Sequence, residues 1–236
     1  MKLRPAPSLS LSLSHEGYAF LAPFVARVRA FFPLQAPATF AGGVGSRVAR
    51  GGPPGARDVV VHIRACNPSK EEQPANLAKS VRLYDAILDR VADRGSVWVI
   101  APAMCGDSKL LGHLRQRYGA EMRSRISRGG GGSAACFGLQ AGVDCTLNDF
   151  RFMALARTLV VAEGSTFSFW AALLAANATQ VHVINPLKDN PKGKFVAHDQ
   201  RDRFVYHDGD GRQWWGRLRE QDGAFEIRYE FSDPKA

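Results

Sequence analysis

Short apolar runs alternate with amphipathic stretches along the middle of the chain. Runs rich in β-branched residues lie at 59–63, 97–101, 158–162 and 180–184. Each run has the length of a strand and is bounded by turn-forming residues, which is typical of strands buried on both faces of a sheet. Between the runs, apolar side chains recur every three or four residues, as they do along one face of a helix. The pattern therefore predicts an α/β domain with a mostly parallel, Rossmann-like sheet over residues 58–187.

The predicted helices follow the strands in the order expected for right-handed crossovers. Apolar residues mark one helix at 77–91 and a second at 110–118, with Gly119 after its end. The side chains suited to cap the starts of the helices are those of Asp107 or Ser108, of Asn148, and of Ser165 or Thr166.

The two ends of the chain differ from this middle part. Residues 1–57 combine a helix-like stretch at 15–34 with a Gly- and Pro-rich linker. Residues 188–236 alternate apolar and polar positions around Asp-Gly turns, which predicts a small β-rich appendage of antiparallel strands or hairpins. Neither a signal-peptide core nor a membrane-spanning run is predicted. The glycines at 129–132 are interpreted as a linker, because no predicted strand leads into them and no lysine follows.

Charge and cysteine content narrow the function classes. The chain has 31 basic and 22 acidic residues, a net charge of +9, but its 23 arginines are spread along the sequence. Since no aromatic-basic RNA motif accompanies them, the composition argues against a nucleic-acid-binding protein. The four cysteines lack CxxC spacing, so a zinc site is not predicted. They fit reduced thiols in an interior, with one or two disulfide bridges left open.

Two candidate sites follow predicted strands, and ligands of parallel sheets bind beyond the carboxyl ends of the strands. His62 and Arg64 end the first strand, and period-two geometry places both on the same side of it. Arg64 can bind a phosphate bidentately, or it can pair with a nearby acid while His62 is a satisfied core residue. In the segment 163–168, Ser165 or Thr166 and the amides of the next helix can bind an anion, or can simply cap that helix.

Asp149 is a third candidate, expected in the first turn of the helix before the strand at 158–162. Its carboxylate can bind a base or a sugar, or it can merely interact with the helix dipole. Trp214 and Trp215 are interpreted as core residues rather than as a stacking platform.

These motifs together resemble the nucleotide-sugar half of α-1,2- and α-1,6-fucosyltransferases. The sequence ValValValHisIleArg matches the H-x-R motif of that superfamily, and residues 148–186 resemble its D-(x)n-A-x-x-[LV]-V-x-x-x-S-[ST]-F-S segment. The resemblance covers roughly residues 16–187. It implies one half of a GT-B fold and an inverting, metal-independent hexosyltransferase that uses GDP-fucose or another nucleotide sugar as donor and a glycan or glycoconjugate as acceptor. No cofactor is implied. Members of this superfamily work in the Golgi or at bacterial membranes.

The resemblance also assigns roles to residues. Arg64 would contact the donor diphosphate and stabilise the departing GDP, and Ser165, Thr166 and the helix amides would hold the same diphosphate. Asp149 would bind the base or the ribose, and His62 would shape the pocket. The nucleotide-sugar-binding residues implied in this way are His62, Asn67, Asp149, Ser165, Thr166, Phe167 and Ser168.

The chain departs from the family pattern in two places. Ala65 and Asn67 stand where many relatives have an arginine and an aspartate in H-x-R-R-x-D. In addition, the 57 residues before the first strand are too few for a second Rossmann-like domain. The alternative hypothesis is therefore a truncated, non-catalytic module that binds nucleotide sugars or glycans.

Overall fold

The computed structural model describes the central and C-terminal parts of the chain. The described residues are 54–64, 74–91, 95–102, 105, 107–126, 145–162, 164–175, 178–184, 203–221 and 224–231. The predicted helix at 15–34, the glycines at 129–132 and Asn67 lie outside these ranges.

A single eight-stranded sheet organises the described residues, with the strands in the order β3-β2-β1-β4-β5-β6-β7-β8. The first six strands along the chain all pair in parallel. Their order, 3-2-1-4-5-6, is that of a Rossmann fold, so the predicted α/β class and Rossmann-like sheet are confirmed. The strands are β1 (Val59–His62), β2 (Val97–Pro102), β3 (Glu121–Ile126), β4 (Thr158–Val161), β5 (Gln180–Ile184), β6 (Phe204–His207), β7 (Gln213–Gln221) and β8 (Ala224–Phe231).

Strand β3 is absent from the sequence-based prediction. Its residues, Glu-Met-Arg-Ser-Arg-Ile, include only two apolar side chains, and β3 lies at the edge of the sheet with β2 as its one strand neighbour. An edge strand needs less apolar sequence than a central one, so the pattern did not reveal it. A strand therefore does precede the glycine-rich segment, which removes one of the two reasons for interpreting that segment as a linker.

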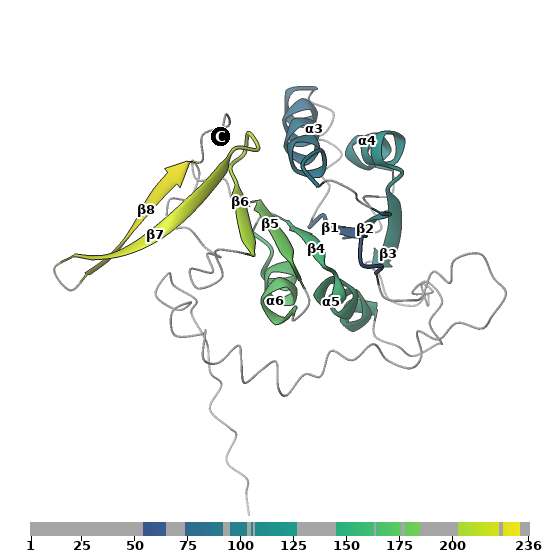
Figure 1. Cartoon of the computed structure of the whole chain (residues 1–236). Coiled ribbons are helices and arrows are strands. Elements are labelled where there is room, and N and C mark those ends of the chain that lie inside the picture. The colour runs from purple at the N-terminus through teal and green to yellow at the C-terminus, as the bar shows by residue number, and fades with distance from the viewer. Residues whose placement is uncertain are drawn as a thin grey trace, which may run out of the picture.

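The parallel part of the sheet also continues beyond residue 187. The sequence places 204–207 in an antiparallel appendage, but β6 pairs in parallel with β5, with Val181 opposite Phe204. Alternating apolar residues fit either direction of pairing, which is why the sequence did not separate them. Strands β7 and β8 form the predicted antiparallel hairpin, and this hairpin projects beyond the parallel strands (Figure 1).

Two pairs of helices cover the two faces of the sheet (Figure 1). Helices α3 (Pro74–Leu88) and α4 (Lys109–Tyr118) lie on one face, and α5 (Cys145–Leu155) and α6 (Thr166–Leu174) lie on the other. The odd positions of β1 pack with α3 and α4, whereas Val60 packs with α5 and α6. Alternate residues of one strand thus reach opposite layers, as the strand pleat requires.

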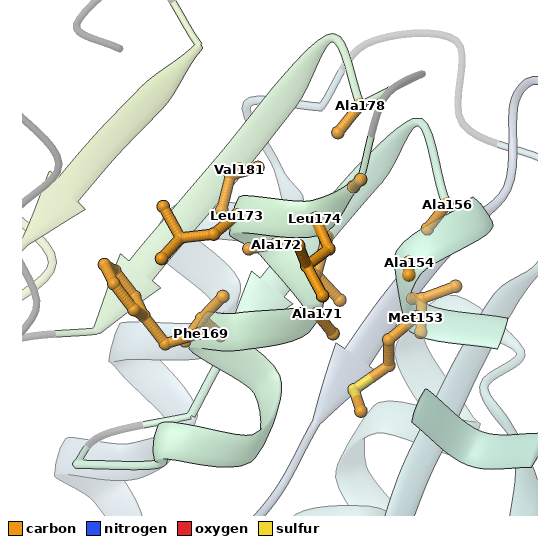
Figure 2. Packing of buried hydrophobic residues seen from close by; sticks show 14 of the residues in the cluster. Met153, Ala154, Ala156, Phe169, Ala171, Ala172, Leu173, Leu174, Ala178 and Val181 are labelled. Carbon is orange, nitrogen blue, oxygen red and sulfur yellow. The ribbon is translucent and has the colours of Figure 1, made fainter. Parts of the chain in front are cut away.

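The layer of α5 and α6 combines alanines with larger apolar side chains such as Phe152, Met153 and Phe169. Figure 2 shows Ala171 and Leu174 on the side of α6 that faces Met153 of α5, while Leu173 lies on the side of Val181 of β5. Small residues let the two helices approach each other and the sheet closely, so their ends are held at defined places relative to β1 and β4.

The ends of α4 and α6 show why the helices begin and stop where they do. The Ser108 hydroxyl accepts a hydrogen bond from the Leu111 amide at 3.1 Å, which caps the start of α4. Gly119, with φ 64°, ends α4 in the left-handed conformation. At α6 the cap is Ser165, one of the two predicted alternatives.

Arg203 ties β6 to the far end of α6, and its loss should destabilise the protein. Its guanidinium donates to the carbonyl oxygens of Ala172, at 2.9 Å, and of Ala175, in the last turn of α6. Because these carbonyls carry the negative end of the helix dipole, we expect Arg203→Ala to lower the free energy of unfolding by about 2 kcal/mol. Urea unfolding measures this loss, with Arg82→Ala, an exposed position on α3, as the control. Equal stability of both variants would contradict a structural role for Arg203.

Candidate functional site

The candidate residues gather where the strand order reverses. Strands β1 and β4 are neighbours in the sheet, but the chain continues from β1 to β2 on one side and from β4 to β5 on the other. The two crossover connections lie on opposite faces, and in open α/β sheets ligands bind beyond the carboxyl ends of the strands at such a point. His62 is the last residue of β1, and Gly164 and Ser165 lie between the end of β4 at Val161 and the start of α6. The two segments singled out in the sequence therefore meet at this point of the sheet.

His62 and Arg64 both contact the start of α6. The ring centroids of His62 and Phe167 are 6.0 Å apart, and Arg64 Nη1 donates a hydrogen bond of 2.6 Å to the carbonyl oxygen of Gly164. Val60, two positions earlier, packs on the same face of the sheet. The period-two prediction that His62 and Arg64 share one side of the strand is thus confirmed.

Arg64 is a cation without a matching anion in the described part of the chain. Its side chain is exposed, and its hydrogen bond to Gly164 goes to a neutral carbonyl group. No carboxylate among the described residues pairs with it. A guanidinium in this state can bind a phosphate or a carboxylate of a ligand.

His62 is buried but not satisfied. Its residue is 7 % exposed, and among the described residues its Nδ1 atom has no hydrogen-bond partner. Burial, and then the positive charge of Arg64, lower the pKa of His62 to about 4. At neutral pH the imidazole is therefore uncharged, so it can donate to or accept from a hydroxyl group but adds no charge to the site.

The first turn of α6 supplies further polar groups. The Ser165 hydroxyl oxygen accepts a hydrogen bond of 3.4 Å from the Ser168 amide, so Ser165 does cap the helix. Its hydroxyl hydrogen can still be donated to a ligand. Ser168 is fully buried, and among the described residues its hydroxyl has no partner. Thr166 is exposed, and its amide belongs to the first turn, whose N–H groups have no acceptor within the helix. The turn can therefore bind an anion as well as being capped.

Asp149 lies in a different part of its helix than predicted. Helix α5 begins at Cys145, so Asp149 is in the second turn, and the prediction that it lies in the first turn is wrong. The interaction with the helix dipole therefore weakens as an explanation for this carboxylate. Asp149 is 3 % exposed, and the ring of its neighbour Phe150 lies 5.5 Å from the ring of Phe167. The Phe150–Phe167 contact brings this part of α5 to the start of α6.

Two contributors to the site were not found from the sequence. Phe150 takes part through its contact with Phe167, and Gly164 takes part through its carbonyl group and its φ of 59°. A glycine directly before a capping serine, between a strand and a helix, is a usable signal for such a turn. The contact between Phe150 and Phe167 depends on how two helices pack, and no local pattern indicates it.

Three observations bear on other kinds of site. The described residues hold no cluster of three or more His, Cys, Asp or Glu side chains arranged for a metal ion. None of their helices is both long enough and apolar enough to cross a membrane. Cys105, which follows β2, is buried and disulfide-bonded, so the bridged alternative holds for this cysteine.

Comparison with known proteins adds no relative to this picture: no family model, no curated protein and no solved structure matches the chain.

Proposed function

We propose that the protein is a glycosyltransferase of the fucosyltransferase-like type, which transfers a sugar, fucose from GDP-fucose, to a hydroxyl group of a glycan with inversion. The observation that carries the proposal is the guanidinium of Arg64 at the first turn of α6, where the strand order reverses and where no carboxylate of the described residues pairs with it. A cation and free helix amides at such a point suit a diphosphate. The H-x-R and Ser-Thr-Phe-Ser motifs, which lie on these two segments, support the same donor.

In this proposal the described residues bind the donor and stabilise its leaving group. The acceptor hydroxyl attacks the anomeric carbon of the sugar and loses its proton to solvent, while the bond from that carbon to the diphosphate oxygen breaks and GDP leaves with the electron pair. Arg64 offsets the negative charge that develops on the diphosphate, an effect that is stronger in a site with little water. His62, which stays neutral, hydrogen-bonds a hydroxyl group of the donor, and Asp149 binds its base or ribose.

The proposal is tested by comparing alanine variants of two serines that both cap a helix. Ser165 and Ser108 each cap a helix by accepting an amide hydrogen bond, but only Ser165 lies at the candidate site. We expect Ser165→Ala to weaken GDP-fucose binding about 10-fold through loss of a hydrogen bond to a charged group, and Ser108→Ala to leave it unchanged. Calorimetric titration of both variants measures this. Equal binding by the wild-type and Ser165→Ala proteins would contradict the proposed donor site.

A module that binds the donor without transferring the sugar is the second candidate. Ala65 and Asn67, in place of the arginine and aspartate of many fucosyltransferases, favour it, because the motif of this chain lacks two charged groups that those enzymes have. The two functions differ in turnover. A glycosyltransferase releases GDP from GDP-fucose in the presence of a glycan acceptor mixture, whereas a binding module holds GDP-fucose without consuming it.

A further inference from the structure

The carbonyl group of Gly164 holds the side chain of Arg64 in place. Gly164 lies in the turn between β4 and α6, and its oxygen accepts the hydrogen bond from Arg64 Nη1 at 2.6 Å. The two residues are 100 positions apart in the sequence. Their contact therefore joins the end of β1 to the start of α6, directly across the point where the strand order reverses.

This contact leaves one edge of the guanidinium available. Among the described residues, the Nε and Nη2 groups of Arg64 have no acceptor, while Nη1 is bound to Gly164. The Nε and Nη2 hydrogens form a fork whose spacing matches two oxygens of one phosphoryl group. A long, exposed arginine otherwise loses much of its rotamer freedom when it binds a ligand. An arginine already held by a carbonyl loses less.

A side chain at position 164 would disturb both the turn and Arg64. The φ of 59° lies in the left-handed region, which glycine adopts without strain. A Cβ atom at this position would lie 3.1 Å from Arg64 Nη1, closer than most such contacts, so the guanidinium would have to shift by a few tenths of an ångström. Glycine therefore allows the turn to form and also gives Arg64 the space to reach the carbonyl.

We propose that Gly164 is a positioning residue, whose carbonyl pre-orients Arg64 so that its free edge faces an anion bound at the first turn of α6. The inference rests on the proposed function in one respect, because that function identifies the anion as the diphosphate of the donor. Gly164 itself contacts Arg64 and acts on the ligand only through it.

A matched pair of glycine variants tests the proposal. Gly119 also has a left-handed backbone, with φ 64°, but a Cβ atom there would meet nothing within 4 Å. Gly164→Ala and Gly119→Ala should therefore both lower the Tm by roughly 2–4 °C through backbone strain. Only Gly164→Ala should weaken the binding of inorganic pyrophosphate and GDP in calorimetry, by about 10-fold, the cost of ordering a free arginine side chain. Wild-type affinity in Gly164→Ala would overturn the proposal.

A double-mutant cycle shows whether the effect passes through Arg64. In an Arg64→Ala background, Gly164→Ala should cause no further loss of pyrophosphate affinity, because the side chain that it positions is gone. A 10-fold loss that persists in that background would show that Gly164 acts on the anion directly, which overturns a positioning role.

A measurement on the ligand-free protein tests the positioning of Arg64 independently of the proposed function. Nitrogen-15 NMR of the Arg64 guanidinium should show slow rotation about the Cζ–Nη1 bond in the wild-type and Gly119→Ala proteins, and fast rotation in Gly164→Ala. Fast rotation in the wild-type protein would overturn the inference whatever the ligand is. Slow rotation together with binding of pyrophosphate but not of GDP would support the inference while contradicting the proposed donor.

Discussion

Replacing Arg64 by alanine should weaken GDP-fucose binding by about 100-fold, because a charge-assisted bidentate contact is worth about 3 kcal/mol. Any sugar transfer should slow by at least the same factor. The reason lies in the free protein: this exposed guanidinium has no carboxylate partner among the described residues and a single neutral acceptor, Gly164. Removing it leaves no carboxylate of the described residues without its partner, so the loss should appear in ligand binding rather than in folding.

Isothermal titration of GDP-fucose into the wild-type, Arg64→Ala and Arg64→Lys proteins measures the effect. The lysine variant keeps the charge but lacks the fork, so we expect an intermediate affinity. Arg82→Ala, a change at an exposed position of α3, is the control for the loss of one positive charge. If Arg64→Ala binds as the wild type does, the guanidinium is not part of a donor site.

Acidification from pH 7 to pH 5 should destabilise the fold, because three buried histidines remain neutral while the chain is folded. Burial, and then Arg64, lower the pKa of His62 to about 4. His182 Nδ1 and His207 Nε2 lie 2.9 Å apart in a fully buried pair on β5 and β6. Burial is the largest cause that lowers the pKa of each, and the charge of Arg90 adds to it, although the Gly211 carbonyl and Asp208 partly oppose the shift of His207.

The direction of the effect follows from these depressed values. Well above pH 7 the histidines are neutral in both the folded and the unfolded chain, so they contribute no pH dependence there. Between pH 6.5 and the lower pKa values of the folded state, the unfolded chain binds more protons than the folded chain. The free energy of unfolding therefore decreases as the pH is lowered through this range. Each buried histidine should remove about 2 kcal/mol of unfolding free energy at pH 5.

Urea unfolding at several pH values between 5 and 8 tests this expectation. The unfolding free energy should level off above pH 7 and fall steeply below pH 6.5. His62→Asn should reduce the slope by about one proton per molecule, because one of the groups that titrates only on unfolding is then missing. A flat profile from pH 7 to pH 5 would contradict the buried, neutral state of these histidines.

The parts of the site that the sequence predicted depend on local geometry. The shared side of His62 and Arg64 follows from the two-residue period of a strand, and the cap at Ser165 follows from a serine between a strand and an apolar helix. Both are decided within a few residues. That the two segments meet follows from a general property of parallel sheets, which places all carboxyl strand ends at one edge.

The parts that the sequence did not predict depend on tertiary structure. The 121–126 strand has few apolar residues and forms because β2 offers it an edge, and β6 is parallel because the chain crosses over before it. The Gly164–Arg64 hydrogen bond joins residues 100 positions apart, which no local pattern encodes. Asp149 was misplaced because α5 begins at Cys145, upstream of the expected cap at Asn148.

The most direct test of a nucleotide-sugar site beyond β1 and β4 is calorimetric titration of the folded chain with GDP, GDP-fucose and UDP-glucose, without added metal. We expect saturable binding of GDP and GDP-fucose, much weaker binding of UDP-glucose, and loss of GDP and GDP-fucose binding in Arg64→Ala. No binding of GDP or GDP-fucose by a chain whose circular dichroism and cooperative unfolding show it to be folded would contradict this expectation.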